Sequence, residues 1–125
     1  MKVELVKIFP EKKIGLIKSE YGEFNAVVED SNVINEEFEC EIEIDKVLIW
    51  GEDIFPFQKG EMAAIYQKDK DVFFIGKFKK IDENISAISI SKSLVLVEVG
   101  ENHDYLGNVI IKVGENLVKV FNSNI

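Results

Sequence analysis

The most constraining feature of this 125-residue chain is the segment from Phe38 to Asp45, in which apolar and acidic residues alternate without error. Successive side chains of a β-strand point to opposite faces, so a period of two predicts an extended strand and not a helix. One face would carry Phe38, Cys40, Ile42 and Ile44, and the other Glu39, Glu41, Glu43 and Asp45. We therefore expect the apolar side chains to be buried and the carboxylates to be exposed.

Short runs rich in Val, Ile and Phe recur along the rest of the chain, and turn-forming residues separate them. No window of helical length has apolar residues at the i, i+3, i+4, i+7 spacing. The predicted strands are Val3–Phe9, Ile14–Lys18, Phe24–Val28, Phe38–Ile49, Met62–Gln67, Val72–Ile81, Ile85–Ile90, Leu94–Val99, Val109–Val113 and Leu117–Phe121. We predict an all-β fold, an antiparallel meander that forms a small barrel or a two-layer sandwich, OB-like or SH3-like.

The first run contains a change of face that a regular strand does not allow. Val3 and Leu5 share one side, whereas Val6 and Ile8 share the other. A β-bulge, which inserts one extra residue into a strand, would reconcile the two pairs.

Length and composition predict a single β domain over residues 1–125, without a membrane span. A chain of this length buries about two-thirds of the surface that it exposes when unfolded. No apolar run approaches the roughly 20 residues of a membrane-spanning helix, and the first residues lack the apolar core of a signal peptide. Cys40 is the only cysteine, which excludes an intrachain disulfide and predicts a reducing, cytoplasmic location.

The net charge of −8 at pH 7 is concentrated in one part of the chain. Residues 29–53 contain ten acidic residues against Lys46 alone, a local charge of −9, so the remainder is close to neutral. This concentration of negative charge disfavours nucleic acid and anionic membranes as ligands and favours a basic protein partner. A solvated strand face kept charged for solubility is the alternative interpretation of the same residues.

Catalytic and metal-binding patterns do not emerge from the sequence, and we predict neither an enzyme nor a cofactor. The acidic strand has neither the unequal environments of a catalytic carboxylate pair nor the spacing of a calcium loop. A Cys40–His103 dyad is disfavoured, because Cys40 occupies an apolar position of the alternation and is predicted to be a small core residue.

Trp50 follows the acidic strand and precedes two more acidic residues. A tryptophan at a strand end is either a lid on the core or an anchor in an interface. The predicted partner-binding residues are Glu39, Glu41, Glu43, Asp45, Trp50, Glu52 and Asp53.

The lysine-only, isoleucine-rich composition is typical of AT-rich bacterial genomes, and the chain is a small acidic β domain with a carboxylate-lined strand from Glu39 to Asp45. In these respects it resembles the small immunity proteins of bacterial toxin–immunity systems. The resemblance implies a non-enzymatic inhibitor that neutralises a cognate basic toxin, such as a nuclease, through the acidic strand face. The alternative is an OB-like or SH3-like module that recognises a peptide, a glycan or single-stranded nucleic acid through exposed aromatic residues.

Overall fold

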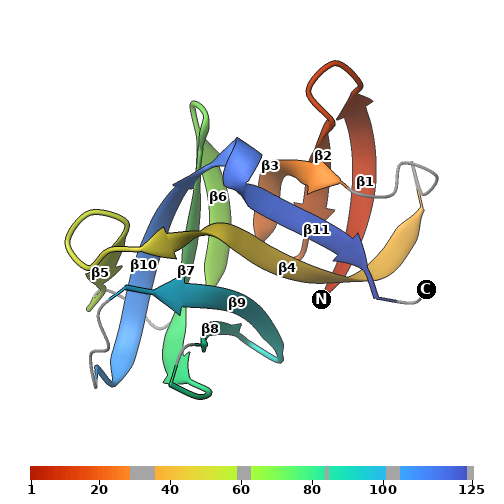
Figure 1. The fold of residues 1–125 in the computed structure, drawn as a ribbon. Coiled ribbons are helices and arrows are strands. Elements are labelled where there is room, and N and C mark those ends of the chain that lie inside the picture. Colours follow the sequence, from red (N-terminus) through yellow and green to blue (C-terminus); the bar gives the residue numbers. More distant parts are fainter. Residues whose placement is uncertain (29–35, 59–62, 84, 101–104, 124–125) are drawn as a thin grey trace.

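The computed structural model describes residues 1–28, 36–58, 63–83, 85–100 and 105–123. Within these ranges the chain forms eleven strands and the short 3-10 helix η2 (Glu115–Leu117), without an α-helix (Figure 1). The strands are β1 (Lys2–Phe9), β2 (Ile14–Ser19), β3 (Gly22–Val28), β4 (Glu37–Leu48), β5 (Ile54–Pro56), β6 (Ala64–Lys68), β7 (Asp71–Lys80), β8 (Ser86–Ile90), β9 (Ser93–Val99), β10 (Gly107–Gly114) and β11 (Val118–Asn122). The all-β prediction is confirmed, and each of the ten predicted strands overlaps an observed one, although Met62, the predicted start of one of them, lies outside the described residues.

Five strands close a barrel in the order β1–β2–β3–β11–β4, because β4 also pairs with β1. The contact between β3 and β11 is parallel, with Val27 opposite Lys119, and the other four contacts are antiparallel. A strand order in which the last strand enters between the third and the fourth is that of an OB-type Greek-key barrel. The barrel is thus confirmed, but its closure through a parallel pair departs from a simple antiparallel meander.

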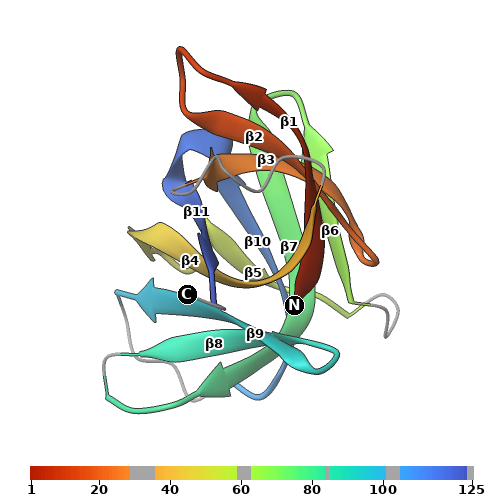
Figure 2. The same cartoon turned by 90° about the vertical axis from the view of Figure 1, so that its right-hand side faces the viewer.

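The strand β4 continues beyond the barrel into a second sheet, ordered β4–β9–β8–β7–β10–β5, with β6 beside the first half of β7. Along one edge β4 pairs with β11, and along the other it pairs first with β1 and then with β9. Figure 2 shows β1, β2 and β3 above β4, and β9 and β8 below it. The long acidic strand is therefore the element that joins the two parts of the fold.

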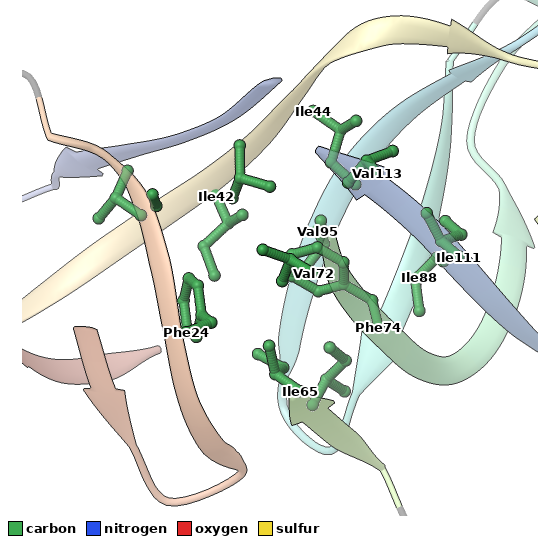
Figure 3. Packing of buried hydrophobic residues seen from close by; sticks show 14 of the residues in the cluster. Phe24, Ile42, Ile44, Ile65, Val72, Phe74, Ile88, Val95, Ile111 and Val113 are labelled. Carbon is green, nitrogen blue, oxygen red and sulfur yellow. The ribbon is translucent and has the colours of Figure 1, made fainter. Parts of the chain in front are cut away.

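One cluster of buried hydrophobic residues draws on both the barrel and the second sheet. Phe24 of β3 meets Phe74 of β7 edge to face, with 6.1 Å between the ring centroids (Figure 3). Gly22 permits β3 and β6 to approach, since its φ is +140° and a Cβ there would overlap the carbonyl oxygen of Ile65. Close contact at this point lets the two parts share a core.

The structure confirms the bulge predicted in the first strand and adds a short strand, β5, that the sequence did not predict. The pairing of β1 with β2 shifts register between Leu5 and Lys7, which confirms the predicted bulge. The strand β5 was not predicted, because Pro56 lowers the strand propensity of a short segment. It lies at the edge of the sheet against β10, where a proline is tolerated.

Candidate functional site

The alternation along β4 is present as predicted. Cys40, Ile42 and Ile44 are 5%, 2% and 4% exposed, whereas Glu39, Glu41, Glu43 and Asp45 are all exposed. Burying the isoleucines fixes the register, because a shift of one residue would place carboxylates in the core. The strand therefore displays a row of acidic side chains on its outer face.

Cys40 belongs to the core on the inner face of β4, as predicted. Burial raises the pKa of its thiol to about 11; the Met1 amino group opposes this shift, and Glu39 and Glu41 add to it. The thiol stays protonated near neutral pH and is a poor nucleophile. His103, the other member of the dyad considered above, lies outside the described residues.

Half of the described acidic residues of the 29–53 segment form ion pairs, and three of the four cations come from outside it. Glu37 pairs with Lys2 at 3.2 Å, Glu39 with the Met1 amino group at 3.2 Å, and Asp45 with Lys119 at 3.1 Å. The fourth pair joins Lys46 and Asp53 at 2.7 Å. The neighbouring strands therefore neutralise part of the −9 that the sequence concentrates here. Glu29 and Asp30 lie outside the described residues.

Two glutamates in the middle of the row differ from their neighbours. Within the described ranges, neither Glu41 nor Glu43 has a cationic group within 4.0 Å. Their side chains are exposed, so water solvates both charges. The described residues therefore leave the charge at the centre of the acidic row without an ion pair.

Asp53 does not belong to the exposed surface, contrary to its predicted role in partner binding. It is only 7% exposed, and its carboxylate accepts hydrogen bonds from Lys46 Nζ at 2.7 Å and from the Ile49 backbone N–H at 2.9 Å. Burial alone would raise the pKa of this carboxyl, but the two hydrogen bonds outweigh it and hold the pKa below its ordinary value. Asp53 stabilises the turn after β4, while Glu52 in the same turn is exposed.

Trp50 is half-buried and packs against the core. Its ring lies 5.4 Å from that of Phe78 and 5.5 Å from that of Tyr105, measured between centroids. These contacts favour the core-lid interpretation over the interface anchor. The predicted binding residues therefore divide: the structure brings the four carboxylates of β4 onto one face and takes Trp50 and Asp53 into the protein.

A groove adjoins this face where β4 and β9 separate. Their parallel pairing runs through Glu43 with Leu96 and resumes at Val47 with Glu98, so that three residues of β4 face Val97 alone. The groove has a volume of about 330 Å³. Its lining combines exposed apolar and charged side chains, namely Val47, Ile85, Leu96, Glu43, Asp45, Lys46 and Glu98. We call the outer face of β4 and β9, with this groove, the acidic surface.

The β9 side of the acidic surface was missed by sequence reasoning. Leu94 and Leu96 are 48% and 41% exposed, although leucines in a strand are expected inside. The sequence does contain a sign of this surface, because β9 has apolar residues on both of its faces. A single core can bury only one of the two faces. Glu98 follows Leu96 on the outer face and makes no ion pair within the described residues.

The described ranges contain neither a metal-binding cluster nor a membrane-spanning helix. No group of three or more His, Cys, Asp or Glu side chains there is arranged to hold a metal ion. No helix in those ranges is long and apolar enough to cross a bilayer. Comparisons of the chain with protein-family models, with curated proteins and with solved structures gave no match.

Proposed function

We propose that this chain is a non-enzymatic binding protein that docks a basic protein partner on the acidic surface, and that its role is that of an immunity protein neutralising a bacterial toxin. The observation that supports this most is a groove with exposed apolar residues, bordered by carboxylates that have no cationic partner among the described residues. Specific interfaces combine an apolar centre with a polar rim, which is the arrangement here.

The electrostatics of the surface suit a cationic partner. Glu41, Glu43 and Glu98 carry solvated charges, and each exposed ion pair nearby is worth only about 0–1 kcal/mol, so a partner's lysines can replace it. A nuclease active site is positively charged because it receives phosphates, and a row of carboxylates can imitate that backbone. Opposite potentials would also accelerate association.

The binding-module alternative is supported by one observation on a different face. Tyr66 is 40% exposed and stacks on Phe73 of β7, with 4.8 Å between centroids and 5° between planes. Each ring thereby covers one face of the other, so that face is not open for stacking on a ligand. The outer face of β2 and β3, where OB-type barrels bind nucleic acids, carries Leu16, Lys18, Glu23, Asn25 and Val27 and no aromatic residue. We therefore favour the protein partner.

The proposal is tested on a partner that has been captured and identified. Association kinetics would be compared between the wild type and the double variant E41Q/E43Q over a range of salt concentrations. Steering by the acidic surface predicts an association rate about three- to tenfold slower at low salt, and a weaker salt dependence. Glu39 is left intact, because its ion pair with the Met1 amino group would confound the comparison.

The matched control is E20Q/E23Q, which removes the same charge from exposed positions at the β2–β3 turn and should leave the rate nearly unchanged. The immunity role further predicts that co-production of the wild-type chain restores the growth of bacteria that produce the partner. Equal effects of the two double variants, or a partner whose toxicity the chain does not relieve, would contradict the proposal.

A further inference from the structure

We propose that the groove between β4 and β9 is the anchor pocket of the acidic surface and binds an arginine side chain of the basic partner. The assignment rests on the proposed function, because the arginine is taken to belong to that partner. It goes beyond a general acidic face by naming one contact, its chemistry and the residues that make it.

The register of the two strands places charge and apolar surface at alternate corners of the groove. Glu43 lies opposite Leu96, and four residues further along β4 Val47 lies opposite Glu98. Ile85 precedes β8, whose first residue is paired with Val97, and it adds a third apolar side chain, 40% exposed. The carboxylates of Glu43 and Glu98 therefore lie at opposite corners of the pocket, with apolar side chains between them.

Long basic side chains suit a pocket of this composition. The methylene stem of an arginine or lysine packs on apolar surface while its charged head stays at the polar edge. A guanidinium offers donors in a planar fork and can bond two carboxylates at once, whereas an ammonium acts as a point charge. Two separated acids, Glu43 and Glu98, therefore favour arginine over lysine.

Within the part of the chain that the structure describes, the cations near the pocket are paired with other acids. Lys46 is the lysine that lines the groove, and its Nζ is held 2.7 Å from Asp53 Oδ1. Asp45 is paired with Lys119 at 3.1 Å, which leaves Glu43 and Glu98 as the lining carboxylates without an ion pair among the described residues. Their charge is therefore complementary to a cation brought by a partner.

The test uses the full chain labelled with ¹⁵N and a capped pentapeptide, acetyl-Gly-Ser-Arg-Ser-Gly-amide, as the probe. Two further peptides carry lysine or the uncharged arginine isostere citrulline at the central position. Titration followed by backbone amide shifts should locate the arginine peptide at Ile44–Val47 and Leu96–Glu98. The affinity order should be arginine, then lysine, with no saturable binding of citrulline.

Matched surface variants separate the pocket from the rest of the acidic surface. E43Q and E98Q should each weaken binding of the arginine peptide about two- to fivefold, while E41Q, on the same face of β4 but outside the groove, should change it little. Likewise L96A should weaken binding, and L94A, two residues away on the same exposed face, should not.

The outcomes distinguish this inference from the proposed function. Shifts that map outside the groove, equal effects of E41Q and E98Q, or binding of the citrulline peptide would overturn the arginine pocket. If the identified partner still bound in a manner sensitive to E41Q/E43Q, the proposed function would stand without the pocket. Arginine-specific binding in the groove together with a partner insensitive to E41Q/E43Q would support the pocket and contradict the proposed function.

Discussion

The second sheet has two outer surfaces whose side chains differ in how they pack and pair with their neighbours. At one end lies the acidic surface of β4 and β9. At the other, β6, β7 and β10 carry a row of half-exposed apolar residues, which we call the aromatic face: Tyr66, Phe73, Ala64, Ile75 and Ile110. Both faces arise from the same alternation of inward and outward side chains, but they differ in composition: the acidic surface combines carboxylates with exposed apolar residues, whereas the side chains of the aromatic face are apolar and pack on one another.

The difference lies in the strand pairing. On the aromatic face the antiparallel register is regular, so each outer side chain has a direct cross-strand neighbour, as in the stack of Tyr66 on Phe73. Between β4 and β9 the pairing is parallel, and three residues oppose one. Regular pairing lets outer apolar groups cover one another, whereas Val47 and Leu96 at the irregular pair are 49% and 41% exposed beside the groove.

The largest expected effect comes from breaking the aromatic face. Phe73→Ala removes the stack with Tyr66 and a half-buried ring, and should lower the free energy of unfolding by about 2 kcal/mol. Leu94→Ala, on the acidic surface, should cost less than about 1 kcal/mol because its side chain is 48% exposed. Urea unfolding measures both. A larger loss for Leu94→Ala would show that the acidic surface is the better packed of the two.

The second prediction concerns the support beneath the acidic surface. Asp53→Asn removes the charged bond to Lys46 and should lower the free energy of unfolding by about 1–2 kcal/mol at pH 7. It should also free Lys46 to pair with a carboxylate of the groove. Binding of the arginine peptide should weaken as a result, which Phe73→Ala should not cause.

The same substitution carries a pH signature with a definite sign. The pKa of Asp53 is lowered in the folded protein, so the unfolded chain binds this proton more readily as the pH falls. Asp53 therefore stabilises the fold above its unfolded pKa, and this contribution is lost as the pH drops through the folded pKa. As the pH falls through and below the ordinary pKa range of an aspartate, the wild type should lose more stability than Asp53→Asn. Parallel curves from urea unfolding would contradict the assigned hydrogen bonds.

Local alternation was sufficient to predict most of the fold. Ten strands, the bulge after Leu5 and the two faces of β4 follow from side-chain period alone. The parallel pairs β3–β11 and β4–β9 were not predictable in this way, because they join segments far apart in the chain and leave no mark on local pattern. The barrel closure and the groove both depend on those pairs.

For the candidate site, the sequence predicted the exposed carboxylates at the centre but not the ion pairs and the buried aspartate around them. Glu41 and Glu43 are exposed as expected, but the charge count could not show that Lys119 and the Met1 amino group would neutralise their neighbours Asp45 and Glu39. The polar turn around Asp53 predicts an exposed side chain. In the structure Asp53 is buried and accepts a hydrogen bond from Lys46, seven residues earlier. Side-chain partners of this kind are decided by tertiary geometry.

The smallest expected effect is on stability when the centre of the acidic surface is neutralised. Side chains two residues apart on one strand face are about 7 Å from each other, so Glu41 and Glu43 repel weakly through water. The double variant E41Q/E43Q should therefore change the free energy of unfolding by no more than about 0.5 kcal/mol, slightly in favour of the folded state at low salt. A loss above about 1 kcal/mol in urea unfolding would mean that the two carboxylates have structural partners. The acidic surface would then be satisfied within the protein, as the aromatic face is, and would have no free charge to offer a partner.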